Sequence, residues 1–447
     1  MGKDNWPNRW VKTDLETIVE KMANGANLPQ SEVQLEGYLP ISRIETIALE
    51  EVDLKRVKYV EADEKIIEKY ALRKGDILFS HINSDKHLGK TAIFNGEVDL
   101  IHGINLLLIR AKEGFDKKLL NYLFKHYRFQ GKFIDVAQRA VNQSSINQKK
   151  LNRFQVPLIP ESEQKRIVTK LDALFGHLDV LREKLDRIPE LLKNFRQQVL
   201  TQAVTGEMTK EWREGKGLGE WPQKVLSELI IDKPRNGYSP KGVGFVTEVK
   251  SLTLSATTKG YFDPIHIKYL DIERPGRDSH LWLKNGDILI QRSNTLDYVG
   301  TSAIYDGEDF DFIYPDLMMK LTVNNMIETK YLYFVLSTNK TKEYFRRNAT
   351  GTAGNMPKIN QGTVMATPIP YPEKEEQQEI VKRIESFFSL ADKIESQYQI
   401  LKANIDQLPQ AILNKAFRGE LVEQEVKDYV RKVGELRMVA EEVRNNI

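Results

Sequence analysis

The chain contains no cysteine at any of its 447 positions. This absence excludes disulfides, thiolate-ligated metals and a cysteine nucleophile, and it fits the reducing cytoplasm, where we expect the protein to work. No apolar run approaches the roughly 18 residues that a membrane span needs. The first ten residues, MGKDNWPNRW, carry charges and tryptophans where a secretory signal would be apolar, so neither export nor a membrane partner is expected.

An excess of charge of one sign is also missing. The formal net charge is only +3, although 29% of the residues are charged. Any surface that binds nucleic acid must therefore be local rather than spread over the whole protein. The content of 40% hydrophobic residues is that of an ordinary soluble protein with several buried cores.

Sequence signatures of catalysis are absent as well. The seven histidines form no HxH or HExxH spacing, so a metal site is not expected. There is no GxxxxGK[ST] phosphate loop, and the glycine-rich KGVGF at 241–245 follows a proline-bearing turn instead of a strand. The Asn-Pro-Pro-aromatic motif of amino-methyltransferases is also missing. We expect no catalytic residue, metal or cofactor in this chain.

What the sequence does contain is an internal duplication. Two segments recur at a shift of 300 − 89 = 211 residues and two more at 376 − 163 = 213: LRKGDIL (72–78) as LKNGDIL (283–289), GKTAIFNGE (89–97) as GTSAIYDGE (300–308), EQKRIV (163–168) as EQQEIV (376–381), and LTQAVTGE (200–207) as LNKAFRGE (413–420). So long a period indicates two domains with two connectors rather than a solenoid.

Each connector carries apolar residues at alternating steps of four and three, which is a heptad seam. The seams are Ile167, Leu171, Leu174, Leu178, Leu181, Leu185, Ile188, Leu192, Phe195 and Val199, then Ile380, Ile384, Phe387, Ala391, Ile394, Tyr398, Leu401, Ile405, Leu408 and Ile412. Either stripe alone would suit a helix packed on its own domain, but two equal stripes favour an intramolecular antiparallel pair. A helix from about residue 162 to 188 would be roughly 40 Å long. Pro189 and Pro409 should break or kink the two helices.

The predicted fold class is α+β, with two similar mixed α/β domains separated by two long antiparallel coiled-coil helices in pseudo-twofold symmetry. Each domain opens with Trp-Pro, at Trp6 and at Trp221, and contains a Gly-Asp turn between apolar strands. We expect strands in DILFS, TAIFNG and NLLLIR and a helix over 117–129 in the first copy. In the second copy we expect strands in DILIQR, TSAIYDG and MKLTV and a helix over about 329–348.

The expected boundaries follow from this division. They are 1–158 for the first globular domain, 159–205 for the first connector, 206–220 for a linker, 221–370 for the second globular domain, 371–418 for the second connector and 419–447 for a charged helical tail.

Polar loops lie at equivalent points of the two domains. SHINSDKHLGK and QRSNTLDYVGT have the same length but little identity, and AQRAVNQSSINQ and NATGTAGNMPKINQ follow the helices. Their Asn, Gln, Arg, Lys and hydroxyl side chains suit base edges and phosphates, although such composition is also that of a solvated loop. The candidates for DNA contact are Ser84, Lys86, His87, Arg139, Asn142, Gln143 and Ser144 in the first domain, and Arg292, Ser293, Asn294, Tyr298, Arg346, Arg347, Thr352, Asn355 and Lys358 in the second.

One pattern suggests catalysis instead. Pro315-Asp316 followed by Glu328-Thr329-Lys330 is similar to the PD and ExK elements of a nuclease that holds Mg²⁺ between two carboxylates. At the shift of 211 residues Asp316 corresponds to Asn105 and Glu328 to Lys117, so the first copy lacks the set. A self-sufficient nuclease built on Asp316, Glu328 and Lys330 stays an alternative, and so does a coiled-coil adaptor that binds proteins only.

Two variable domains joined by heptad helices, with EQKRIV and EQQEIV at the helix starts and AVTGE and ILNKAFRGEL at their ends, resemble the specificity (S) subunit of a type I restriction–modification system. The resemblance covers nearly the whole chain, is strongest over 160–213 and 370–421, and is closest to the IA-like branch. It implies two target-recognition domains, each reading half of a split double-stranded DNA site, with the helices as a ruler. Half-sites one helical turn apart would lie about 34 to 36 Å between centres, close to the expected helix length.

The resemblance also implies a division of labour. The S subunit would catalyse nothing, while two modification (M) subunits bring S-adenosylmethionine to methylate adenine, and restriction (R) subunits bring ATP and Mg²⁺ for translocation and cleavage. Because the polar loops of the two domains differ, the DNA site should be asymmetric. The tail repeats apolar residues at Val426, Val430, Val433, Leu436, Val439 and Val443. It suggests an amphipathic helix that docks on an M subunit or on the chain's own connectors.

Overall fold

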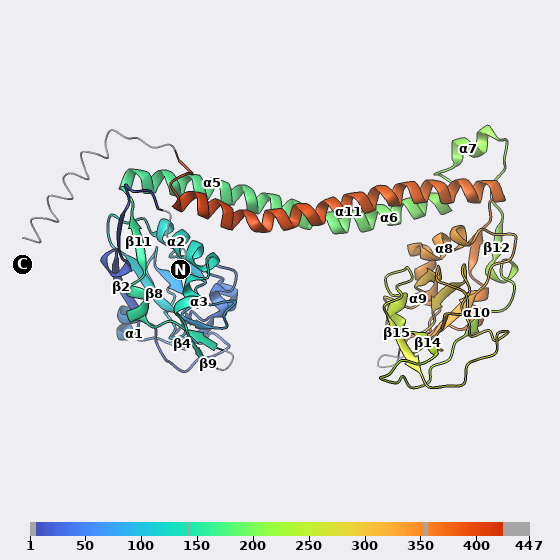
Figure 1. The fold of residues 1–447 in the computed structure, drawn as a ribbon, viewed down its shortest axis with the longest axis horizontal. Helices are drawn as coiled ribbons and strands as arrows, with labels where there is room; N and C mark the ends of the chain where they lie inside the picture. Colours follow the sequence, from blue (N-terminus) through green and yellow to red (C-terminus); the bar gives the residue numbers. More distant parts are fainter. Residues whose placement is uncertain (1–5, 141–142, 352–355, 423–447) are drawn as a thin grey trace, which may run out of the picture. The chain divides into compact units, whose positions relative to one another are not determined.

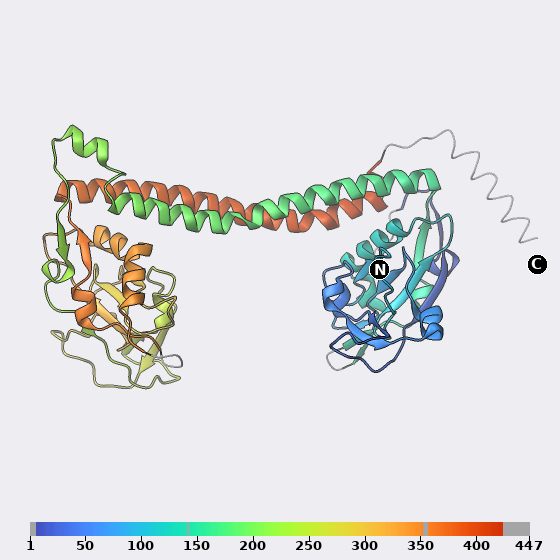
Figure 2. The same ribbon diagram turned by 180° about the vertical axis from the view of Figure 1, so that it is seen from behind.

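The computed structural model describes residues 6–140, 143–351 and 356–422. They form two units, one with the residues up to Leu185 and those from Ile400, the other with Asp186–Gln399. Helix α11 (Lys374–Phe417) contributes its first part to the second unit and its last part to the first. Each unit therefore contains one globular domain and a pair of helices, which Figures 1 and 2 show from two sides.

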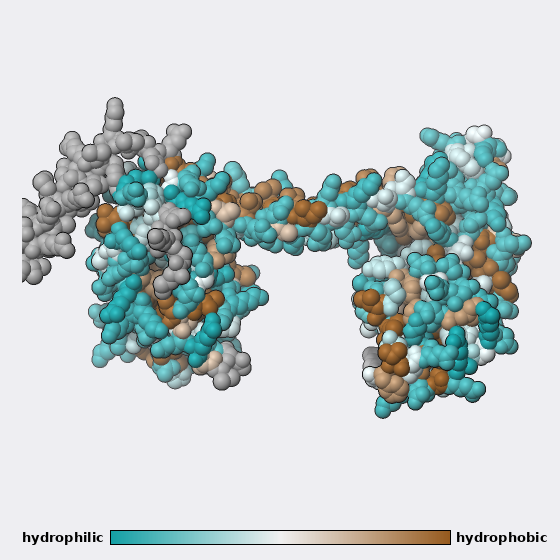
Figure 3. Space-filling view, viewed as in Figure 1, coloured by the Kyte–Doolittle hydropathy of each residue, from teal (hydrophilic) through white to brown (hydrophobic). Residues whose placement is uncertain are grey.

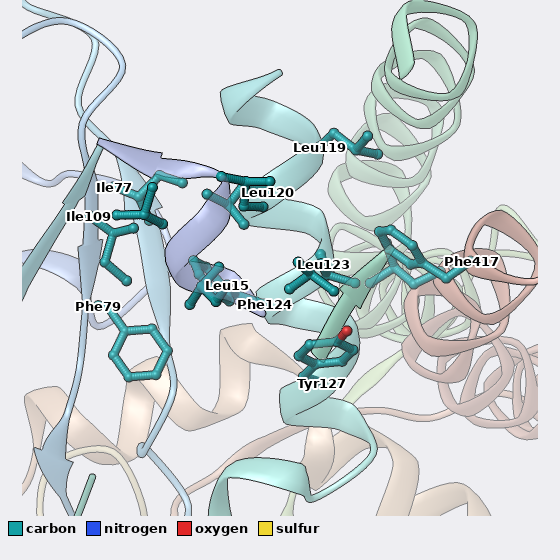
Figure 4. Close-up of a cluster of buried hydrophobic side chains, with 14 of the residues drawn as sticks. Leu15, Ile77, Phe79, Ile109, Leu119, Leu120, Leu123, Phe124, Tyr127 and Phe417 are labelled. Atoms are coloured by element: carbon teal, nitrogen blue, oxygen red, sulfur yellow. The ribbon is translucent and has the colours of Figure 1, made fainter. Parts of the chain in front are cut away.

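A four-stranded antiparallel sheet forms the centre of unit 1. Its order is β2 (Val19–Asn24), β8 (Leu107–Ala111), β5 (Ile77–Phe79), β7 (Thr91–Ile93). Ile77 and Phe79 pack under α2 (Lys117–Phe129), as Figure 4 shows, whereas Leu78 packs on the opposite face. Side chains alternate between the two faces of a strand. Because both faces of this sheet are covered, the sequences of its central strands are continuous apolar runs. The strands and the helix expected here are confirmed.

Unit 2 repeats this sheet in the order β13 (Arg235–Asn236), β19 (Met318–Leu321), β16 (Ile288–Gln291), β17 (Ser302–Ile304). The expected strands are again present. The single helix expected over 329–348 is wrong, because the segment forms α8 (Thr329–Ser337) and α9 (Asn339–Arg347). Thr338 separates them: its backbone is extended and its hydroxyl accepts from the Thr341 N–H at 3.2 Å, which caps α9.

Hydrogen bonds hold each Gly-Asp turn against the neighbouring part of its sheet. Gly75 and Gly286 have φ of 99° and 89°, a conformation that favours glycine. The buried carboxylate of Asp76 accepts two 2.7 Å hydrogen bonds from Arg110. That of Asp287 accepts a 2.7 Å bond from the Thr322 hydroxyl. The turn is thus tied to β8 in unit 1 and to the residue that follows β19 in unit 2.

Shorter elements surround the two sheets. In unit 1 they are β1 (Val11–Asp14), β3 (Tyr38–Ile41), β4 (Lys58–Glu61), α1 (Glu64–Tyr70), β6 (Ile82–Asn83), α3 (Lys132–Val136), β9 (Gln138–Ala140), β10 (Gln143–Ser145), α4 (Gln148–Asn152) and β11 (Gln155–Leu158). In unit 2 they are α7 (Lys210–Gly215), β12 (Gln223–Val225), β14 (Val249–Leu252), β15 (Ile267–Leu270), β18 (Phe312–Ile313), α10 (Gln361–Met365) and β20 (Pro368–Pro370). Strands β1 with β11, and β12 with β20, join the beginning and end of each globular domain.

The first connector is two helices, α5 (Glu161–Asp186) and α6 (Ile188–Val204), and the second is α11 alone. The break expected at Pro189 is confirmed, because Pro189 occupies the first turn of α6, where its missing N–H costs no hydrogen bond. Pro409 does not break its helix but lies inside α11. In unit 2 Arg196 of α6 donates to Asp392 and Glu395 of α11, each at 2.8 Å.

The heptad seams are only half buried. Residues seven apart are covered, among them Leu178, Leu185, Leu192 and Val199, and Ala391, Tyr398 and Ile405. Several alternate positions stay exposed: Leu181, Phe387, Ile394, Leu401 and Leu408 are 39–48% accessible, although the ring of Phe387 also packs edge-to-face on Phe195 of α6. We call these five residues the exposed stripe.

The repeated Glu-Gln at the start of each connector ties it to its domain. The buried Glu163 accepts from Arg9 at 2.6 Å and from the indole of Trp10 at 3.1 Å. Gln164 accepts from the Asp116 N–H, just before α2, at 2.7 Å.

Unit 2 repeats this tie, with Glu376 accepting from Trp221 at 2.9 Å and Gln377 from the Glu328 N–H at 2.8 Å. Trp10, rather than Trp6, is thus the counterpart of Trp221.

Candidate nucleic-acid interface

A small sheet in unit 1 gathers residues from distant parts of the chain. Its order is β6–β10–β9, with Ser144 opposite both Asn83 and Arg139. The Ile146 N–H then donates to the His81 carbonyl at 2.9 Å. The sheet therefore joins the segment before Ser84 to the segment that carries Arg139 and Gln143, as the loop hypothesis needs.

A hydrogen-bonded turn follows β6, in residues 83–89. The side chain of Asn83 donates to Ser80 Oγ at 3.1 Å and accepts from the Ser84 N–H at 2.8 Å. The N–H groups of His87 and Leu88 both donate to the Ser84 carbonyl, at 2.9 and 3.0 Å. Lys86 is exposed and His87 partly exposed, whereas Leu88 is buried.

Ser144 does not face solvent, unlike Arg139 and Gln143, which are exposed. It is 3% accessible, and its hydroxyl donates to the carboxylate of Asp85 in the turn. We therefore assign it to holding the turn rather than to contacting DNA. Asn142, the remaining candidate of this domain, lies outside the described residues.

The turn lies in a locally positive environment. Burial lowers the pKa of His87, and the nearby cations Lys90, Lys86 and Arg128 lower this pKa further. Burial also lowers the pKa of Lys90, against the opposing effect of Glu50. Glu50 forms ion pairs with Lys125 and Arg128 and offsets part of this charge, which leaves Lys86 as the exposed cation available to a phosphate anion. The charge is local, as the small net charge of the chain requires.

Unit 2 contains a turn of the same construction, in residues 294–300. The side chain of Asn294 donates to Gln291 Oε1 at 2.6 Å and accepts from the Thr295 N–H at 2.7 Å. The N–H groups of Tyr298 and Val299 donate to the Thr295 carbonyl at 3.0 and 2.9 Å. The side-chain amide of Asn294 is therefore occupied by hydrogen bonds within the turn, whereas Tyr298 is 42% exposed.

The pairing beside this turn also repeats. The backbone of Lys358 forms antiparallel β-bridges with Ser293 and with Thr350. The Ile359 N–H donates to the Arg292 carbonyl at 2.9 Å. Arg292 is partly buried and Lys358 exposed, so the two cations flank the start of the turn. Ser293 is fully buried and its hydroxyl lacks a hydrogen-bond partner. Its burial is at odds with the predicted role in DNA contact.

The two arginines at the end of α9 differ. Arg346 donates from Nε to the Leu296 carbonyl at 2.9 Å, so it braces the backbone of the turn. Arg347 is exposed and forms a surface ion pair with Glu343. Thr352 and Asn355 lie outside the described residues, as do the tail positions from 423 on.

Sequence reasoning missed Asn83 and Asp85. The signal was present, because both loops share the pattern Asn-[Ser/Thr]-x-x-x-[Leu/Val]-Gly at residues 83–89 and 294–300. The comparison of the loops by overall identity hid these four shared positions.

The residues of the nuclease pattern do not meet. Asp316 precedes β19 and accepts from the Ser239 hydroxyl at 2.5 Å. Glu328 follows β19 and pairs with Lys374, and Lys330 pairs with Glu385, both partners being on α11. An extended strand rises about 3.3 Å per residue, so the carboxylates lie toward opposite ends of β19. Among the described residues no three His, Asp or Glu side chains gather as metal ligands.

Comparison with known proteins decides between the remaining alternatives. The family model of the type I restriction modification DNA specificity domain matches residues 7–190 and 257–402. The chain belongs to this family. It is a DNA-recognition subunit, and the family catalyses no reaction, so the nuclease and adaptor hypotheses are both wrong.

Relatives match along most of the chain. The EcoKI specificity subunit of Escherichia coli K12 is 26% identical over 433 residues, which is 95% of this chain and 92% of that one. The crystal structure of the HsdS subunit from Thermoanaerobacter tengcongensis aligns with a TM-score of 0.57 and 18% identity over 94% of this chain and 99% of its own. A chain from a structure concerned with complex assembly of a type I R-M system aligns at 0.65 and 19% identity, over 93% and 99%. The expected fold class is confirmed.

The specificity family acts on DNA together with other subunits of the restriction–modification system. No helix in the described part of the chain has both the length and the apolar character that membrane crossing requires.

Proposed function

We propose that this specificity subunit reads an asymmetric, bipartite double-stranded DNA site, with one half-site for each globular domain. The observation that carries the proposal is the repeated turn. The same hydrogen bonds hold residues 83–89 and 294–300, but the side chains between the fixed ends differ. Two equal frames with different side chains would read two different sequences.

The candidates that remain in the interface have suitable chemistry. Arginine and lysine can donate to guanine edges or to phosphates, glutamine can pair with adenine, and hydroxyls suit phosphate oxygens. They are Ser84, Lys86, His87, Arg139 and Gln143 in unit 1, and Arg292, Tyr298, Arg347 and Lys358 in unit 2.

The wider assembly follows the same proposal. Two M subunits would bring S-adenosylmethionine and modify adenine, and R subunits would bring ATP and Mg²⁺, all in the cytoplasm. The exposed stripe supports such assembly, because apolar residues recurring along a helix pair offer a surface for a partner protein.

Substitution of Arg292 by alanine tests base reading in unit 2. One terminal nitrogen of its guanidinium, Nη1, donates to the Asp316 carbonyl at 3.4 Å, which orients the remaining donors. In competition binding by the assembled complex, we expect lost discrimination at one base pair, worth about 1–3 kcal/mol.

The control for this test is Arg274→Ala, which removes an equal charge from an exposed ion pair with Glu248 in the same unit, outside the candidate interface. Uniformly weaker binding with a smaller salt slope would instead identify Arg292 as a phosphate contact. A wild-type complex without sequence preference would contradict the proposed function itself.

A further inference from the structure

The ends of the two turns cannot vary freely. Each closes on a glycine with positive φ, 76° at Gly89 and 81° at Gly300. A Cβ atom would come within 2.3 Å of the ring of Phe133 in the first case and within 2.4 Å of that of Phe345 in the second. Each opens on the asparagine that holds its backbone. Glycine and asparagine therefore fix the position of what lies between them.

The middle of each turn is free of these constraints. Asp85-Lys86-His87 in unit 1 stands where unit 2 has Leu296-Asp297-Tyr298, at the shift of 211 residues. The six residues differ in charge, size and polarity, yet the backbone bonds around them are the same. Leu296 is 54% exposed at the tip, an apolar side chain of the kind that contacts the methyl group of thymine.

The backbone conformation of the unit 2 turn depends less on the side chains of residues 296–298 than that of the unit 1 turn depends on residues 85–87. Arg346 braces it through the carbonyls of Leu296 and Asp297, which any residue supplies. In unit 1 the carboxylate of Asp85 itself accepts the hydroxyl of the buried Ser144. A substitution at Asp85 would leave that hydroxyl unpaired, whereas substitutions at 296–298 leave the bracing bonds intact.

From this geometry we infer that residues 85–87 and 296–298 are specificity triplets, each of which determines adjacent base pairs of one half-site, and that the unit 1 triplet can replace that of unit 2. Asn83 and Asn294 are positioning residues that hold the triplets and do not read bases. The inference rests on the proposed function, since it says which residues of each domain carry the reading. It adds Asp85, Leu296 and Asp297 to the residues that determine specificity.

The test transfers the unit 1 triplet into unit 2, by Leu296→Asp, Asp297→Lys and Tyr298→His together. The variant and wild-type chains are assembled with their modification subunits, and modified adenines are mapped by sequencing on a random-sequence DNA library. We expect the preference to change about tenfold or more at adjacent base pairs of the half-site read by unit 2. The half-site read by unit 1 should be unchanged.

The possible outcomes distinguish a failure of the triplet inference from a failure of the proposed function. A wild-type map with two half-sites and a variant map identical to it overturns the triplets alone. A wild-type map without a bipartite site overturns the proposed function. If the triple variant does not assemble, Tyr298→His alone is mapped, and an unchanged half-site in that variant also overturns the inference.

The role of Asn83 has its own readout. Asn83→Ala removes the acceptor for the Ser84 N–H, so discrimination should relax across the base pairs that residues 85–87 read. Asn83→Asp keeps an acceptor in the same place and should restore the pattern of preferred bases, even if its charge weakens binding overall. An alanine variant that discriminates as the wild type does, or an aspartate variant that fails to restore the pattern, contradicts a positioning role.

Discussion

At the scale of single residues, two buried histidines make unit 1 sensitive to acid. Burial lowers the pKa of His81 and of His102 to about 4, and only the second is partly compensated, mainly by its 2.9 Å hydrogen bond with the Leu106 carbonyl. The pKa is 6.5 when a histidine is exposed, so the folded state binds fewer protons than the unfolded state between pH 6.5 and 4. This contribution to stability is complete above pH 6.5 and is lost as the pH falls toward 4.

We therefore predict that the free energy of unfolding of unit 1 falls through this window by about 1.4 kcal/mol per pH unit for each histidine. Denaturant unfolding between pH 7 and 4.5 measures the slope. His102→Gln keeps a donor for the Leu106 carbonyl but cannot titrate, so its slope should be smaller than that of the wild-type chain. Equal slopes in the two proteins would show that His102 does not titrate in this range.

At the scale of elements, the exposed stripe should contribute to assembly. Phe387 is 41% and Ile394 is 40% exposed along α11, and burying them against a partner would be worth about 1–3 kcal/mol each. We expect the double variant Phe387→Ser with Ile394→Ser to bind the modification subunits at least tenfold more weakly, as measured by light scattering across a concentration series. Gln397→Ser, an exposed polar substitution on the same helix, should have no effect. Undiminished assembly of the double variant would exclude the stripe as a docking surface.

Some helices and strands could be predicted from the sequence, and others could not. The central strands and α2 could be predicted because buried apolar runs and a periodic helix face are local signals. The division of 329–348 into α8 and α9 could not, because the hydroxyl of Thr338 caps a helix within a segment whose apolar spacing suggested continuity. The heptad pattern predicted paired helices but not that four seam positions on α11 and one on α5 would stay exposed, since periodicity does not say how many partners cover a helix.

The candidate site was predictable in part for a similar reason. Composition predicted that Lys86, His87 and Tyr298 lie in surface turns, and the structure exposes all three at least in part, because exposed polar turns have a characteristic sequence. It could not tell that Ser144 and Ser293 turn inward, since burial there depends on pairing between segments some 60 residues apart. Asn83 and Asn294 stand at equivalent places of a pattern that both loops share, and their matching hydrogen bonds show the structural role of that pattern.

At the scale of the whole molecule, duplication explains the division between constancy and difference. The sheets, the Gly-Asp turns and the ties of Glu163 and Glu376 to their tryptophans repeat closely between the units. The exposed side chains of the turns do not repeat. A duplicated fold whose turns carry different exposed side chains accounts for both observations. It predicts a DNA site whose two halves differ.

The most direct test is the map of adenines modified by the wild-type chain assembled with its modification subunits. The account predicts two specified segments of different sequence, separated by an unspecified gap of constant length. Two identical half-sites in inverted orientation, one continuous specified segment, or modification without sequence preference would contradict it.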